Sequence, residues 1–327
     1  MIGIVFIPIG FALLMSSNMV REIKIDYTNC KSDKQNLSCA DVIARDIYES
    51  CKCSQVFYLD EDYERDVFVY YGLTNFYQNH RRYVKSRGDK QLLGQLDSLG
   101  DCEPFAYGPV GAAGKRRPIA PCGAIANSLF NDTFTFYRFD EKRSGGKFSH
   151  VPVLNTGIAW ATDLSAKFKN PKLREGQKLK DAFQGFDHPP NWRHNIWEMD
   201  DKVEANNGFA YEALVVWMRN AALPSFRKLW GRFNHQAEEY KFGLPRGKYM
   251  VEVSYNYPVS GFKGTKKLII SNTSWLGGKN PFLGVAYIAI GFICLLLSGV
   301  FLFIHRKFGK STGDLLNITA RTPYMTS

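Results

Sequence analysis

The 327-residue sequence lacks the short motifs that mark common catalytic and nucleotide-binding sites. It contains no G-x-S-x-G nucleophile turn, no H-E-x-x-H zinc motif, no P-loop and no G-x-G-x-x-G dinucleotide loop. It has only seven cysteines and no C-x₂-C pair, so a zinc site is not indicated. Its 45% hydrophobic and 22% charged residues exclude a disordered or collagen-like chain. No motif therefore indicates an enzyme class or a cofactor.

Charge is missing altogether from residues 283–304 (LGVAYIAIGFICLLLSGVFLFI). As a helix this segment is about 33 Å long, and the hydrocarbon core of a bilayer is about 30 Å thick. Basic residues follow at His305, Arg306, Lys307 and Lys310. A basic flank on one side only places that side in the cytoplasm. The segment is therefore predicted to be a transmembrane helix rather than a buried core helix.

The N-terminal segment, residues 1–15 (MIGIVFIPIGFALLM), is also uncharged. As a helix it would be only about 22 Å long, which is short for a membrane span. One interpretation is a signal peptide, but there is no basic start and no clear A-x-A site before Arg21. We favour a transmembrane helix whose beginning is missing from this sequence, with a kink at Pro8.

These observations predict a chain in four parts. They are a first transmembrane helix at 1–19, an ectodomain at 20–280, a second transmembrane helix at 281–304 and a basic cytoplasmic tail at 305–327. The net charge of +11 divides into +3 on the tail and +8 on the middle. A basic lumenal domain suits acidic partner loops or anionic lipid head groups, or it is simply a solvated surface.

The cysteines and the glycosylation sequons test this topology. Six cysteines lie in the predicted ectodomain, and an even number suits an oxidising compartment. Their spacing leaves fifteen pairings open. N-x-S/T sequons stand at Asn36, Asn131 and Asn272, and Asn272 is the weaker candidate because it lies only about ten residues from the membrane.

Alternating apolar and polar residues predict strands in the middle of the chain. Residues 248–258 (KYMVEVSYNYP) and 267–271 (KLIIS) are predicted to form a β-hairpin. Residues 66–73 and 133–139 are also typical of strands. We therefore expect an antiparallel, α+β, β-rich domain of roughly 260 residues.

Helical patterns are fewer. Residues 211–233 place an apolar stripe on one helix face, and Pro224 is expected to begin a second helix. The stripe consists of Leu214, Trp217, Met218 and Ala221, and the second helix would carry Phe226, Leu229 and Trp230.

Two weaker patterns offer other functions. Asp60 and Asp62 lie in an acidic run and could hold a divalent metal, as in a lumenal membrane-anchored enzyme. The basic, aromatic segment 75–87 (NFYQNHRRYVKSR) is of a kind found in nucleic-acid-binding proteins, but a lumenal position excludes that partner. We expect Phe76, Tyr77 and Tyr83 to serve in packing instead.

Small residues recur every seven positions in the second apolar segment, at Gly284, Gly291 and Ser298. They fall near one helix face, where small side chains let another transmembrane helix approach closely. This pattern favours a membrane partner over a lone anchor.

Seven ordered motifs resemble the cell cycle control protein 50 family, also called transmembrane protein 30. They are NFYQNHRRYVKSR (75–87), IAPCGAIANSLFNDT (119–133), GIAW-TD (157–163), NNGF (206–209), VWMRNAALPSFRKL (216–229), YNYPV (255–259) and GGKNPFLGVAYI (277–288). The resemblance extends from about Ile4 to the end of the second apolar segment, so it covers nearly the whole chain.

The resemblance implies two transmembrane helices, cytoplasmic termini and a glycosylated, disulfide-bonded, β-rich ectodomain. It implies a non-catalytic β-subunit of a type IV P-type ATPase, a phospholipid flippase, with membrane lipids around it. Such subunits let the ATPase leave the endoplasmic reticulum for the Golgi, endosomal and secretory vesicles and the plasma membrane, and they support its transport cycle. A stand-alone receptor glycoprotein remains an alternative.

The resemblance also implies residue roles. It pairs Cys30 with Cys53, Cys39 with Cys51, and Cys102 with Cys122. It matches Asn131 to a family glycosylation site. The sequence departs from the family where Glu252 replaces a frequently glycosylated Asn, and in its missing N-terminal tail.

Overall fold

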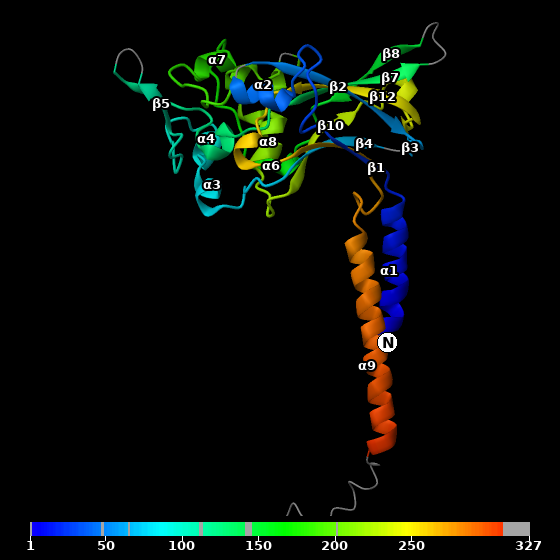
Figure 1. The fold of residues 1–327 in the computed structure, drawn as a ribbon. Coiled ribbons are helices and arrows are strands. Elements are labelled where there is room, and N and C mark those ends of the chain that lie inside the picture. The colour runs from blue at the N-terminus through cyan, green and yellow to red at the C-terminus, as the bar shows by residue number, and fades with distance from the viewer. Residues whose placement is uncertain are drawn as a thin grey trace, which may run out of the picture. The chain divides into compact units, whose positions relative to one another are not determined.

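The computed structural model describes residues 2–46, 49–64, 66–110, 114–140, 146–200 and 202–309 (Figure 1). It contains two compact units. One is the domain Glu22–Asn272, and the other combines Met1–Arg21 with Thr273–Ser327. Most of the expected basic tail at 305–327 lies outside the described residues.

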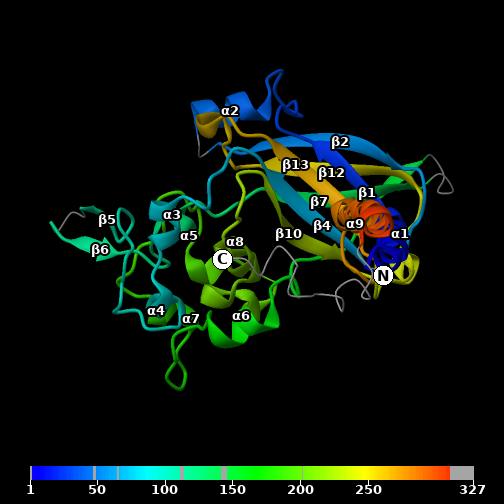
Figure 2. The ribbon, with the colours of Figure 1, turned by 90° about the horizontal axis from the view of Figure 1, so that it is seen from below.

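The domain is built on two antiparallel sheets, as the alternating patterns predict (Figures 1 and 2). The five-stranded sheet has the order β1 (Glu22–Asp26), β13 (Lys266–Asn272), β4 (Val67–Leu73), β10 (Phe226–Phe233), β9 (Val153–Leu154). The four-stranded sheet has the order β2 (Cys51–Leu59), β12 (Gly247–Tyr255), β7 (Thr133–Asp140), β8 (Lys147–Val151). Two small ribbons pair β11 (Gly243–Leu244) with β3 (Tyr63–Glu64), and β5 (Tyr107–Val110) with β6 (Arg116–Pro118).

Strand β12 shows why these residues form sheets. Its odd-numbered side chains are buried and its even-numbered ones are only half-buried, because successive side chains point to opposite faces. The buried faces of both sheets contribute to one hydrophobic cluster. Phe136 of β7 meets Phe233 of β10 edge-on, with ring centroids 5.2 Å apart, so aromatic contacts join the two sheets.

The predictions of strands at 66–73 and 133–139 are confirmed by β4 and β7. The predicted hairpin is wrong, because β12 belongs to the four-stranded sheet and β13 to the five-stranded sheet. The chain turns away directly after β12, where the backbone N–H groups of Asn256 and Tyr257 donate to Asp132.

The described part of the domain also contains short α-helices and 3₁₀ turns. The α-helices are α2 (Cys39–Arg45), α3 (Arg81–Lys85), α4 (Asp89–Leu92), α5 (Ala124–Asn127), α6 (Ala161–Ala166), α7 (Leu179–Ala182) and α8 (Glu212–Met218). The 3₁₀ turns are η1 (Ile196–Glu198), η2 (Glu204–Asn206), η3 (Gly208–Ala210), η4 (Glu238–Tyr240) and η5 (Ser260–Phe262).

Helix α8 buries Leu214, Trp217 and Met218, as the apolar stripe predicts, but it ends before Ala221. The second helix predicted from Pro224 is wrong, because Phe226–Phe233 forms strand β10. Pairing with β4 decides the conformation there, and a bulge between Leu229 and Gly231 breaks its register.

The packing predicted for segment 75–87 is only partly right. Phe76 and Tyr83 pack against the core, and their rings meet edge-on with centroids 5.8 Å apart. Tyr77 is 56% exposed, so its predicted packing role is wrong.

The second unit consists of α1 (Ile2–Asn18) and α9 (Pro281–Phe308). Helix α9 has 28 residues and is about 42 Å long. Among the described residues it is the one helix long and apolar enough to cross a membrane, and α1 is a shorter apolar helix of 17 residues. Asn280 caps α9 by accepting the N–H of Phe282 at 3.2 Å, and Pro281 occupies the first turn.

Candidate functional site

The glycine face of α9 packs against α1 of the same chain. A Cβ on Gly284 would lie 2.9 Å from the carbonyl oxygen of Gly10, and one on Gly3 would lie 2.6 Å from that of Gly291. These distances are too short for any side chain, so the two backbones touch through four glycines. At Gly284 and Gly291 the helix that approaches closely is α1 of the same chain, and Ser298 is exposed.

The rest of α9 presents apolar side chains outward. The most exposed of them are Phe282, Leu296, Phe301, Leu302, Phe303 and Phe308. Only 6% of the most apolar 18-residue stretch of α9 is buried. The faces of α9 that α1 does not cover can therefore contact lipid or another membrane helix.

A buried ion pair stands in the core of the domain. The Nζ of Lys266 lies 2.7 Å from Oδ2 of Asp132, and neither side chain is exposed. The same ammonium donates to the carbonyl of Tyr257 at 2.7 Å and lies 3.0 Å from the ring centroid of Tyr255. Burial lowers the pKa of Lys266 to about 8, although Asp132 opposes this shift, so the lysine is charged at neutral pH.

Asp132 uses both carboxylate oxygens. Oδ2 also accepts the hydroxyl of Tyr27 at 3.0 Å, while Oδ1 accepts the backbone N–H groups of Asn256 at 2.6 Å and Tyr257 at 2.7 Å. Lys266 belongs to β13, Tyr27 directly follows β1, and Asn256 and Tyr257 directly follow β12. Because every partner is structural, Asp132 fixes the fold and has no exposed face for chemistry.

A second buried lysine, Lys228, caps the C-terminal end of α8. The Nζ of Lys228 donates to the carbonyls of Val216 at 3.0 Å, Trp217 at 2.8 Å and Arg219. Such carbonyls have no partner within the helix, so the lysine satisfies them. Burial lowers the pKa of Lys228 to about 7.

Three disulfides cross-link the domain. They are Cys30–Cys53, Cys39–Cys51 and Cys102–Cys122, the pairs that the resemblance implies. The sulfurs of Cys30, Cys39 and Cys53 lie within 4.8 Å of one another, but all three are in disulfides and offer no thiolate to a metal. Cys294 in α9 is a free thiol.

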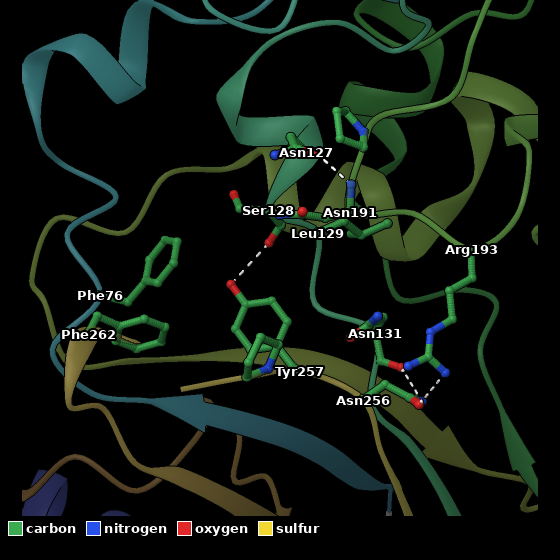
Figure 3. Close-up of a pocket in the computed structure, with 12 residues that line it drawn as sticks. Phe76, Asn127, Ser128, Leu129, Asn131, Asn191, Arg193, Asn256, Tyr257 and Phe262 are labelled. Carbon is green, nitrogen blue, oxygen red and sulfur yellow. Dashed lines mark hydrogen bonds between the residues drawn. The ribbon is translucent and has the colours of Figure 1, made fainter. Parts of the chain in front are cut away.

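Two adjoining cavities are lined by the segment before β7 and by the loops around residues 191 and 256, and the larger one also borders strands β4 and β10. Their volumes are about 530 Å³ and 230 Å³, and Figure 3 shows the smaller one. The side chains that border both are Leu129, Asn131, Asn191, Arg193 and Asn256. Neither these cavities nor the buried lysines follow from the sequence patterns.

The model of the LEM3 (ligand-effect modulator 3) family / CDC50 family matches residues 13–311. The chain belongs to the CDC50 family. Mouse cell cycle control protein 50A is 46% identical to it over 315 residues, which cover 95% of this chain and 83% of the mouse protein. Human cell cycle control protein 50B is 44% identical over 317 residues, with coverage of 95% and 87%. An Arabidopsis thaliana protein called putative ALA-interacting subunit 4 is 38% identical over 320 residues, with coverage of 95% and 83%.

This CDC50-family chain does not assemble the metal site considered from its sequence. Asp60 and Asp62 are exposed, and Oδ1 of Asp62 accepts the backbone N–H of Arg246 at 2.6 Å. Within the described ranges, the one group of three or more close metal-ligating side chains is the disulfide-bonded cysteine cluster. Asp60 and Asp62 are not part of that group.

The three sequons in residues 20–280 of this CDC50-family chain occupy different environments. Asn36 is exposed. Asn272 is buried, and its Nδ2, the atom that would carry a sugar, donates to the carbonyl of Glu64 at 3.1 Å. A sugar on this atom would break that bond and would not fit the buried position, so the folded domain requires an unmodified Asn272. Asn131 is half-buried beside the two cavities.

Proposed function

We propose that this CDC50-family protein is a non-catalytic accessory β-subunit of a type IV P-type ATPase that translocates phospholipids. The observation that carries the proposal is the family match over residues 13–311. The Arabidopsis thaliana relative is likewise called an interacting subunit.

We propose that both α1 and α9 cross the membrane, with both termini in the cytoplasm and residues 22–272 in the lumen or outside. The basic residues at the end of α9 support this orientation. The close glycine contacts support a transmembrane pair, since such contacts are a common way for helices to associate in lipid. Three disulfides support an oxidising compartment for the domain.

In this proposal the subunit acts through contacts alone. The exposed apolar faces of α9 would pack on the membrane domain of the ATPase, and the domain 22–272 would cover its lumenal loops. Tighter binding to one state of the transport cycle would shift the cycle toward that state. Binding during synthesis would let the ATPase fold and leave the endoplasmic reticulum for the Golgi, endosomes, secretory vesicles and plasma membrane.

Co-purification tests the proposal directly. The full chain with an affinity tag is extracted from cell membranes in mild detergent, and the proteins that remain bound are identified by mass spectrometry. We expect a P-type ATPase to be enriched over an equally tagged, unrelated single-span glycoprotein. Cells without the chain should expose aminophospholipid on their surface, which annexin binding measures.

Normal lipid asymmetry without the chain, together with no bound ATPase, would contradict the proposal. Normal delivery of the chain to the cell surface in cells that lack its ATPase would instead favour a stand-alone receptor.

A further inference from the structure

The two adjoining cavities beside Asn131 together form a recess in the domain. They share five lining residues, and the volume of the larger one, about 530 Å³, falls within the usual size of small-molecule sites. The larger cavity has aromatic walls, Tyr211 and Trp230, and polar groups from Asn155 and Glu198. This mixture suits a ligand that has both apolar faces and many hydroxyl groups.

Asn131 lines both cavities, and Figure 3 shows it at the smaller one. Its Oδ1 is buried and has no hydrogen-bond partner, and no described residue bonds to its Nδ2. A buried amide oxygen without a partner costs free energy, so the site is incomplete as it stands.

The backbone at Asn131 cannot swing away from the recess. Its carbonyl accepts the Nδ2 of Asn256 at 3.2 Å, and the next residue, Asp132, is held by the buried lysine. Because Asn131 lines both cavities, a group attached to its Nδ2 would begin beside the recess.

Asn131, Asp132 and Thr133 form a glycosylation sequon. We propose that the recess is a cradle for the first N-acetylglucosamine residues of an N-glycan on Asn131. The transferase modifies the chain while it is extended, and folding then carries the first sugars into the recess. The rings of Trp230 and Tyr211 would face the apolar sides of the sugars, while the free amide of Asn191 would bond to their hydroxyl and acetamide groups. This inference depends on the proposed lumenal position of the domain.

Site-resolved deglycosylation tests the cradle, with Asn36 as an internal control. The full chain is purified from eukaryotic cells in detergent and treated with peptide-N-glycosidase, either folded or denatured, and glycopeptides are quantified by mass spectrometry. Release from Asn131 needs a local opening, and an opening that costs about 1.4 kcal/mol slows release about tenfold. We expect the folded protein to lose the Asn36 glycan at least about tenfold faster, and the denatured protein to lose both alike.

A cavity-filling variant separates the cradle from other causes of protection. Ala213 borders the larger cavity, so Ala213→Trp should displace the sugars and bring release at Asn131 close to the rate at Asn36. Ala166→Trp on the exposed end of α6 is the matched control and should keep the protection. Should Ala213→Trp fail to fold, Thr133→Ala removes the glycan instead and should lower the Tm, whereas Asn36→Gln should leave it unchanged.

The remaining outcomes of the deglycosylation experiment each overturn either the cradle or the proposed topology. Equal release from both sites in the folded wild type would overturn the cradle, as would protection that persists in a folded Ala213→Trp variant. A glycan on Asn36 with none on Asn131 would overturn the cradle and leave the topology standing. No glycan at either site would overturn the lumenal position of the domain itself.

Discussion

The buried ion pair between Lys266 and Asp132 offers the sharpest test of the fold. Lys266→Met keeps an unbranched side chain of similar length but removes the charge that Asp132 faces at 2.7 Å. The carboxylate would remain fully buried with one hydroxyl and two backbone N–H donors. A buried charge that loses its partner in this way is strongly unfavourable.

The expected cost follows from burial. Removal of one partner of a buried pair costs about 3–5 kcal/mol. For a domain of about 250 residues, 1 kcal/mol changes the Tm by about 2–4 °C, so the Tm should fall by about 6–20 °C. Asp132→Asn removes the second charge while its side-chain oxygen can still accept from the backbone of Asn256 and Tyr257. We therefore expect the double variant to recover at least half of the Tm lost in Lys266→Met.

The assay is thermal unfolding of the full chain in detergent, followed by tryptophan fluorescence. Lys267→Met is the matched control, since Lys267 is adjacent but points to the other face of β13, and it should change stability by less than about 0.5 kcal/mol. Additive losses in the double variant would refute the reasoning, because independent effects would mean that the two charges do not stabilise each other.

Three further predictions concern the disulfides, the helix pair and pH. Loss of the Cys102–Cys122 bond by double Ser substitution should cost about 3 kcal/mol for its 20-residue separation, and an unchanged Tm would contradict this. Gly284→Leu should separate α1 from α9 and reduce the monodisperse fraction on size exclusion, whereas Gly299→Leu, which meets no atom within 4 Å, should not. Burial lowers the pKa of Lys228 to about 7 from 10.5, so between these values the unfolded state binds more protons and stability rises with pH. The wild-type Tm should therefore rise from about pH 7 to about pH 9, and Lys228→Met should flatten that slope.

Local periodicity explains what the sequence predicts well. Strands β7 and β12 alternate in hydrophobicity, β4 is rich in β-branched and aromatic residues, and α9 contains a long uncharged run, so each can be identified from neighbouring residues alone. Strand β10 could not be identified from neighbouring residues, because its pairing with β4 joins residues more than 150 positions apart. The sheet to which β12 belongs depends equally on distant residues, since Asp132 draws the chain away after Tyr255.

For the helix pair α1 and α9, the glycine spacing in the sequence indicated a close helix contact but was used for only one of the two helices. The seven-residue spacing at Gly284 and Gly291 correctly predicts close helix contact, but the same spacing at Gly3 and Gly10 identifies the partner as the chain itself. Lys266 had no comparable signal, because a lysine at the start of a strand is usually solvated. Its burial depends on an aspartate 134 positions away.

The place of β13 has a consequence for synthesis. The last strand of the domain lies between β1 and β4, so the first strand has no partner until the chain has been made to residue 272. Contacts between such distant residues form slowly, because a long loop must close first. The five-stranded sheet therefore closes only when nearly the whole domain has been translated. A chain that stops early leaves β1 and the edge of β4 unpaired, which gives cellular quality control a structural mark of an incomplete protein.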